Sequence, residues 1–120
     1  MSRIIIGAAN ELHKRIGPGL LESAYENALA FELRQKGLEV KQQYSLPFVY
    51  KEVRQDIGYR VDPLMDDKVM VEIKSTGQLA PVHFSQTLTY LKLSGPKLAL
   101  LINFNAKILK GNIHRIVNKL

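Results

Sequence analysis

At 120 residues, the chain is close to the commonest size of a single domain and long enough to bury a hydrophobic core. It has no cysteine, which excludes disulfides and thiolate zinc sites and fits a cytoplasmic protein. No apolar run approaches the roughly 18 residues of a transmembrane helix, and the first residues are too soon interrupted to form a signal peptide. We therefore expect one domain over residues 1–120 and no membrane partner.

The net charge of +6 is unevenly distributed along the chain. All 11 acidic residues lie at or before Glu72, so that this first part is close to neutral. The basic residues that follow are Lys74, Lys92, Lys97, Lys107, Lys110, Arg115 and Lys119. Such asymmetry indicates a surface that faces a polyanion, most simply nucleic acid, with a merely solvated basic face as the alternative.

Two amphipathic helices are predicted at the start of the chain. Apolar residues recur at helical spacing over residues 3–16, and the Gly-Pro-Gly sequence at 17–19 ends this helix. A second apolar stripe follows and stops at Gly37.

Strands are predicted next. Residues 38–44 and 46–51 alternate like strands, and Pro47 favours an edge position or a bend. Residues 56–65 and 68–75 are predicted to form a hairpin.

The last part of the chain predicts a helix and two strands. The helix starts at Pro81 and ends at the Ser-Gly-Pro sequence 94–96. The apolar run 98–102 is typical of a central strand, and residues 113–117 form a weaker terminal strand. The predicted order is helix, helix, three or four strands, helix, strand, strand. The residues that follow the central strand, Asn103 to Asn105, are expected to form a turn.

The strand over residues 69–74 carries two charged side chains in an otherwise apolar segment. Alternation places Glu72 and Lys74 on one face, and Val69, Val71 and Ile73 on the other. Burying a carboxylate and an ammonium is costly unless they pair or hold a metal. The segment is therefore a candidate metal site or, alternatively, a solvated hairpin edge with an ordinary surface pair.

The hairpin loop decides whether a second carboxylate joins Glu72. With a two-residue turn, Glu72 and Asp62 would point to opposite sides of the sheet. With the three-residue loop 66–68, Met65 faces Val69 and Asp62 lies directly across from Glu72. A bulge could also bring the two carboxylates to one side, and Pro63, which cannot donate a ladder hydrogen bond, is a plausible position for it. Cross-strand Cβ atoms are then roughly 4.5–5.5 Å apart, close enough for one divalent ion to bridge both carboxylates.

Four further polar residues are candidates for chemistry. Glu22 stands in the first turn of the second helix, where the helix dipole favours a carboxylate, and it could also add an oxygen to the metal shell. Gln86 and Tyr90 are four residues apart on one face of the third helix, and His83 is offset by three residues. Their alternatives are a solvated face for Gln86, core packing for Tyr90 and a surface position for His83.

Taken together, these motifs resemble the GxxExxY family of the PD-(D/E)xK nuclease superfamily. Gly19, Glu22 and Tyr25 form the naming motif. Residues 58–62 followed by 71–74 are similar to the split acidic motif of the superfamily. The helix residues Gln86 to Tyr90 resemble the Q-x-x-x-Y motif of RecB-like nucleases, and residues 101–104 match the strand after that helix. Pro63 departs from the pattern, since the family usually has an apolar residue there.

The resemblance implies an α/β fold with a restriction-endonuclease-like core, in which helices flank a mixed central sheet. It also implies Mg²⁺- or Mn²⁺-dependent cleavage of nucleic acid phosphodiesters, with DNA as the expected substrate. Asp62 and Glu72 would hold the ion, with the Ile73 carbonyl and Glu22 as further oxygen ligands. Lys74 would orient the attacking water and stabilise charge on the phosphate, while Gln86 and Tyr90 would position the phosphate or support Lys74.

Two other functions remain open at this stage. The fold could serve as a nucleic-acid-binding or assembly module without turnover, although the joint presence of Asp62, Glu72 and Lys74 argues against this. A purely structural domain would leave the one-sided charge unexplained. The sequence does not separate DNA from RNA, exonuclease from endonuclease, or monomer from homodimer.

Overall fold

Two helices open the chain in the computed structural model. The structure describes residues 2–42, 44–50, 53–61, 64–65 and 68–118, with side chains described for 2–42 and 68–118. Helix α1 spans Ser2–Ile16 and α2 spans Glu22–Gln35, as the apolar spacing predicted. Between them, Gly17 and Gly19 have φ angles of 76° and 110°, a region that glycine adopts readily.

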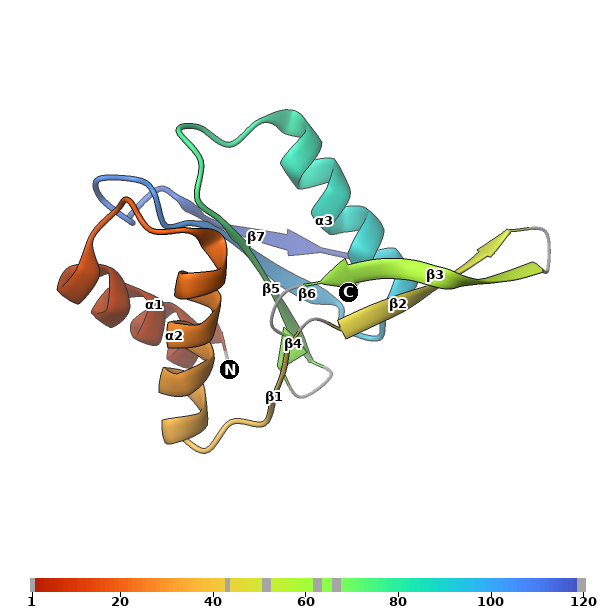
Figure 1. Cartoon of the computed structure of the whole chain (residues 1–120), viewed down its shortest axis with the longest axis horizontal. Coiled ribbons are helices and arrows are strands. Elements are labelled where there is room, and N and C mark those ends of the chain that lie inside the picture. The colour runs from red at the N-terminus through yellow and green to blue at the C-terminus, as the bar shows by residue number, and fades with distance from the viewer. Residues whose placement is uncertain (1, 43, 51–52, 62–63, 66–67, 119–120) are drawn as a thin grey trace.

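A five-stranded mixed sheet forms the centre of the molecule, with the strand order β1-β4-β5-β6-β7 (Figure 1). Strands β5 and β6 are parallel, and the other neighbours are antiparallel. Helix α3, Pro81–Leu93, connects the parallel pair, as a parallel crossover requires. The strands are β1 (Val40–Lys41), β4 (Leu64–Met65), β5 (Val69–Lys74), β6 (Leu98–Asn103) and β7 (Ile113–Val117).

Helices cover both faces of this sheet. Val69, Val71 and Ile73 of β5 belong to the main hydrophobic core with α1 and α2. Met70 belongs to a second cluster with Tyr90 and Leu91 of α3. Because alternate residues of β5 pack into different layers, the predicted separation of the two faces of this strand is confirmed.

The hairpin predicted over residues 56–75 is wrong in its first strand. Strand β3, Val53–Val61, pairs with β2, Tyr44–Tyr50, in a separate two-stranded ribbon, and only Leu64–Met65 pairs with β5 (Figure 1). Among the described residues, five strands therefore lie between α2 and α3, instead of three or four. The prediction failed because β3 pairs with the strand just before it, and the alternation of residues does not identify a strand's partner.

Proline marks an irregularity in β2. The pairing of β2 with β3 shifts register between Leu46 and Phe48, on either side of Pro47. Proline has no N–H to donate to a strand ladder, so the register breaks where the sequence predicted a bend. Pro63 lies outside the described residues, between β3 and β4.

Candidate active site

Glu72 is a buried carboxylate on the α3 side of β5. Its residue surface is 3% exposed. Its Oε1 lies 3.6 Å from the Lys74 Nζ, whereas its Oε2 has no hydrogen-bond partner within the described part of the chain. A buried carboxylate oxygen without a partner is unfavourable, and native proteins usually satisfy such an atom with a donor, a water or an ion. This oxygen is therefore a candidate ligand atom.

The surroundings of Glu72 favour a second cation. Desolvation by burial raises the pKa of Glu72 from 4.5 to about 7, although the Lys74 ammonium acts in the opposite direction. The negative charges of Glu22 and Glu26 on α2 raise the pKa further. Glu26, which the sequence did not single out, is buried and accepts a hydrogen bond of 2.9 Å from the Gln42 amide. Burial therefore outweighs the attraction of Lys74, and a further cation would stabilise the ionised carboxylate.

The side chain of Lys74 extends from the last residue of β5 toward α3. Its Nζ is 3.6 Å from the Glu72 Oε1 and donates a long hydrogen bond of 3.5 Å to the Gln86 Oε1. The structure thus brings together Glu72, Lys74 and Gln86 from the two sequence motifs. Tyr90, one turn further along α3, is 7% exposed and packs in the cluster that contains Met70.

His83 has a local contact at the start of α3. Its Nδ1 accepts a hydrogen bond of 2.9 Å from the backbone N–H of Ala80, the residue before the helix. The first turn of a helix leaves N–H groups without intrahelical partners, and His83 satisfies one at the helix boundary. The contact gives His83 a capping role.

Glu22 ties the start of α2 to the end of β5. Its Oε2 accepts a hydrogen bond of 3.3 Å from the backbone N–H of Ser75, the residue after Lys74. The Ser75 hydroxyl in turn donates to the Leu20 carbonyl at 2.6 Å. Figure 1 shows that the start of α2 lies at the carboxyl end of β5. Glu22 is therefore close to the candidate site, although its side chain is exposed.

Asp62 lies outside the described residues, and its approach to Glu72 stays a prediction. Val61, just before it, pairs with Tyr44 in the β2–β3 ribbon, and the nearest pairs with β5 are Leu64 with Met70 and Met65 with Val69. The pairing of Met65 with Val69 is the register predicted for the three-residue loop, one of the two arrangements that would allow the shared site. Ile73, whose carbonyl is a further candidate ligand, buries its side chain on the opposite face with α1 and α2.

Asn103 has a structural role that its sequence context did not predict. It is the last residue of β6, pairs with Lys74 and is 1% exposed. Its Oδ1 accepts hydrogen bonds of 3.2 Å from the N–H groups of Thr76 and Asn105, and its Nδ2 donates to the Thr76 carbonyl at 3.0 Å. The side chain thus fixes the backbone just after Lys74. The only signal for it was an asparagine directly after an apolar strand.

Tyr25 of the GxxExxY motif holds the turn between α1 and α2. Its hydroxyl donates to the Gly17 carbonyl at 2.6 Å and accepts from the Leu20 N–H at 3.2 Å. Its ring stacks on Phe104, with 4.7 Å between ring centroids. The tyrosine therefore joins the turn before Glu22 to the chain that follows β6.

Substitution of Asn103 should destabilise the fold. We expect Asn103→Ala to lower the free energy of unfolding by about 1–3 kcal/mol, because its backbone partners would lose their bonds in a partly buried region. Urea unfolding followed by circular dichroism would measure the change. Asn10→Ala, at an exposed position of α1, is the control and should change stability by no more than about 0.5 kcal/mol. Equal midpoints for the two variants would contradict a structural role for Asn103.

Comparison with known families agrees with this geometry. A family model described as the PD-(D/E)XK nuclease superfamily matches residues 1–116. The chain belongs to this superfamily. Its helix-flanked mixed sheet is consistent with a restriction-endonuclease-like core, and superfamily membership supports a nuclease-type hydrolase with a nucleic acid substrate. No curated protein and no solved structure matches the chain.

Members of the superfamily generally use divalent metals, so the candidate ligands are of interest. The Glu72 Oε2 is a buried oxygen without a described partner, and oxygen is the ligand that Mg²⁺ prefers. In the ranges that the structure describes, no group of three or more His, Cys, Asp or Glu side chains could hold a metal. The described residues therefore fit part of a metal site.

None of the described helices combines the length and apolar character needed to cross a membrane.

Proposed function

We propose that this chain is a metal-dependent nuclease that hydrolyses the phosphodiester bonds of DNA. The observation that carries the proposal is the buried Glu72 carboxylate, with one oxygen unsatisfied by described residues and the other beside Lys74. In a surface ion pair both charged groups would be hydrated, whereas a bound cation would stabilise the buried and unsatisfied oxygen of Glu72. Gly19, Glu22 and Tyr25 support assignment to the GxxExxY branch of the superfamily.

The metal proposal assigns the ion to carboxylates at the end of β5. Glu72 supplies the buried oxygen, Asp62 the second carboxylate, and the Ile73 carbonyl and Glu22 extend the oxygen set. Hard oxygen ligands of this kind suit Mg²⁺ or Mn²⁺. When bound, the ion supplies Lewis-acid polarisation of the scissile phosphate.

Lys74 is the proposed catalytic cation of the chain itself. Its ammonium would orient the attacking water and stabilise the negative charge that develops on the phosphate. Gln86 supports this role because its Oε1 accepts from the Lys74 Nζ at 3.5 Å and limits the positions that the flexible side chain adopts. Tyr90 would position the phosphate or keep α3 in place beside the strand.

Metal binding and cleavage by the purified protein test the function. In isothermal titration calorimetry, we expect Mn²⁺ to bind the wild type and to lose its affinity for Glu72→Ala. With Mg²⁺ or Mn²⁺, the wild type should cut plasmid or single-stranded DNA, and Glu72→Ala should not. A protein that binds DNA but cuts neither DNA nor RNA of any topology would instead be a binding module, and cleavage restricted to RNA would overturn the choice of DNA.

A further inference from the structure

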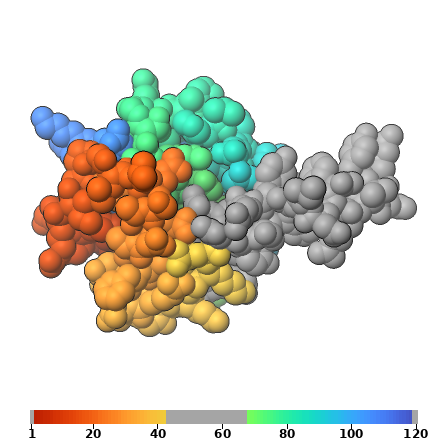
Figure 2. Space-filling model, in the orientation of Figure 1, coloured from red at the N-terminus to blue at the C-terminus, as the bar shows by residue number. Residues whose placement is uncertain are grey.

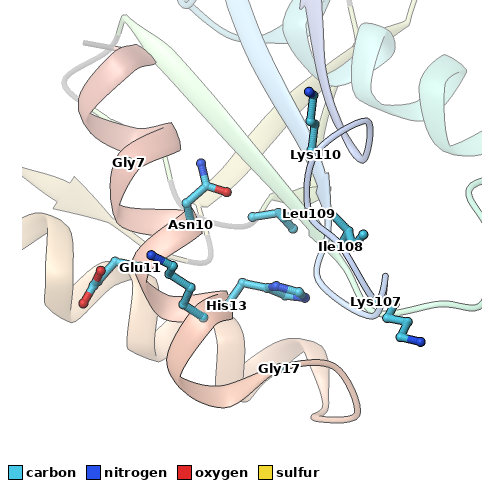
Figure 3. Close-up of a pocket in the computed structure, with 10 residues that line it drawn as sticks. Gly7, Asn10, Glu11, His13, Gly17, Lys107, Ile108, Leu109 and Lys110 are labelled. Carbon is cyan, nitrogen blue, oxygen red and sulfur yellow. The ribbon is translucent and has the colours of Figure 1, made fainter.

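A groove separates α1 from the segment that connects β6 to β7 (Figure 3). Its volume is about 680 Å³. Lys14 reaches it from α1, while Lys107 and Lys110 come from the connecting segment, on either side of Ile108 and Leu109. We call this feature the α1 groove. The three lysines line one groove although more than ninety positions separate Lys14 from the other two along the chain.

The α1 groove is positively charged. Lys14, Lys107 and Lys110 are all exposed, and none of them forms an ion pair with any residue that the structure describes. The carboxylate of Glu11, which also lines the groove, pairs with Arg15 at 2.9 Å. The lysine charges are therefore available to an external anion.

The segment that carries Lys107 and Lys110 is held firmly against the protein. The His13 Nε2 donates to the Ala106 carbonyl at 2.7 Å. Leu109 is 3% exposed and belongs to the main hydrophobic core, and its carbonyl accepts from the Asn112 N–H at 2.8 Å. Because the backbone is fixed on both sides of the two lysines, a ligand would not have to order the segment when it binds.

The α1 groove lies at the same end of the sheet as the candidate active site. Gly17 lines the groove, and the Gly19 N–H donates to the Asn105 Oδ1 at 3.1 Å. The next residue, Leu20, accepts from Ser75, which directly follows Lys74. The turn between α1 and α2 therefore separates the groove from the site. Figures 1 and 2 show the segment after β6, in blue, beside α1 at this end.

We infer that the α1 groove binds the phosphate backbone of the nucleic acid strand that continues beyond the Glu72–Lys74 site. The inference rests on the proposed function and extends it to the flanking nucleotides. A small anion would need buried donors that converge on one point, whereas these lysines are exposed and spread along an open groove. Ile108 is 67% exposed at the same place and offers an apolar contact to a sugar or base.

The α1 groove shows that the charge asymmetry along the sequence does not by itself identify the lysines of this surface. Lys14 belongs to the part of the sequence that is close to neutral, yet it joins two lysines of the basic part. Lys92 and Lys97 belong to the basic part but lie near the end of α3 and before β6, close to the amino end of that strand. Position in the fold, and not position after Glu72, identifies the lysines of this surface.

The experiment compares two double variants with equal loss of charge. Lys107→Ala with Lys110→Ala removes two lysines of the α1 groove, and Lys92→Ala with Lys97→Ala is the matched control. Binding of a fluorescently labelled single-stranded DNA, long enough to span site and groove, is measured by anisotropy over a series of salt concentrations in the presence of a chelator. All substituted lysines are exposed, and circular dichroism would verify that each variant is folded.

We expect the groove variant to bind the strand more weakly and to reduce the log–log salt slope by about 0.7 for each lysine that contacts a phosphate. The control should keep the wild-type slope. Equal slopes for the two variants, or no DNA binding by the wild type, would overturn the inference. An acidic peptide that binds in the groove while DNA does not would also overturn it, in favour of a protein partner.

The experiment can refute the inference about the groove and the nuclease proposal independently, because DNA binding is measured without metal. A wild type that never cuts DNA but binds it through Lys107 and Lys110 would refute the nuclease proposal and keep the groove. A wild type that cuts DNA while the groove variant retains its full salt slope would refute the groove and keep the nuclease.

Discussion

Lys74→Ala should abolish detectable DNA cleavage while leaving the affinity for Mn²⁺ close to that of the wild type. The reason is that Lys74 acts as a charge beside the reacting phosphate and is not a ligand of the ion. Loss of one such preorganised group typically lowers a rate by a factor on the order of 10²–10³. A plasmid-nicking time course on gels, with calorimetric titration of Mn²⁺ into the same preparation, would measure both quantities.

Glu72→Ala and Lys68→Ala are the companion variants for this test. Glu72→Ala should lose both cleavage and metal affinity, because it removes the buried ligand oxygen. Lys68→Ala removes an exposed lysine just before β5 and should retain both. If Lys74 merely neutralises Glu72, its loss should instead alter metal affinity and stability. Normal cleavage by Lys74→Ala would refute the proposed mechanism without affecting superfamily membership.

Local patterns predicted most of the fold. The apolar spacing of α1 and α2, and the Gly-Pro-Gly turn between them, depend on contacts within a few residues. The alternation along β5 likewise predicted that Glu72 and Lys74 share one face. For Glu72 the sequence left a buried site and a solvated hairpin edge as alternatives, and the structure shows the carboxylate buried.

Partners that are distant in the chain were harder to predict. Residues 56–65 have the composition of one strand, but their pairing is divided between β2 and β5. The bonds of Asn103 go to Thr76, 27 residues earlier, so composition near Asn103 could indicate only a turn. The α1 groove also depends on partners that are distant in the chain, since a hydrogen bond between its two walls joins His13 to Ala106, 93 residues apart.

At the candidate site, some features followed from local sequence patterns and others depended on partners distant in the chain. The four-residue spacing of Gln86 and Tyr90 predicted a shared helix face, yet only the tertiary structure shows Gln86 against the Lys74 Nζ and Tyr90 in the core. Glu26 has the sequence context of an ordinary helix glutamate, and its influence on Glu72 arises from the packing of α2 against β5.

Metal-free protein should lose stability as the pH rises from about 4.5 to about 7, and Glu72 should be responsible. Burial raises the pKa of Glu72 from 4.5 to about 7, so within this range the folded state keeps a proton that the unfolded state has released. Stability must then fall with rising pH, by roughly 3 kcal/mol once the pH exceeds the folded-state pKa. In Glu72→Gln, which is neutral at every pH, this part of the pH dependence should disappear.

Urea unfolding in a chelator, at about pH 5 and about pH 8, would measure this difference. Glu39→Gln changes an exposed glutamate and should follow the wild type. If the free energy of unfolding depends on pH in the same way for the wild type and Glu72→Gln, burial of the Glu72 carboxylate does not destabilise the folded protein.

Addition of Mg²⁺ or Mn²⁺ at about pH 8 should then restore stability to the wild type, because only the deprotonated carboxylate binds an ion. An ion present at one hundred times its dissociation constant would contribute about 2.7 kcal/mol, close to the penalty that burial of the Glu72 charge imposes. Glu72→Gln should gain much less from the same ion. Equal stabilisation of both proteins would place the ion elsewhere, whereas stabilisation of the wild type alone would identify Glu72 as the group whose burial the metal compensates.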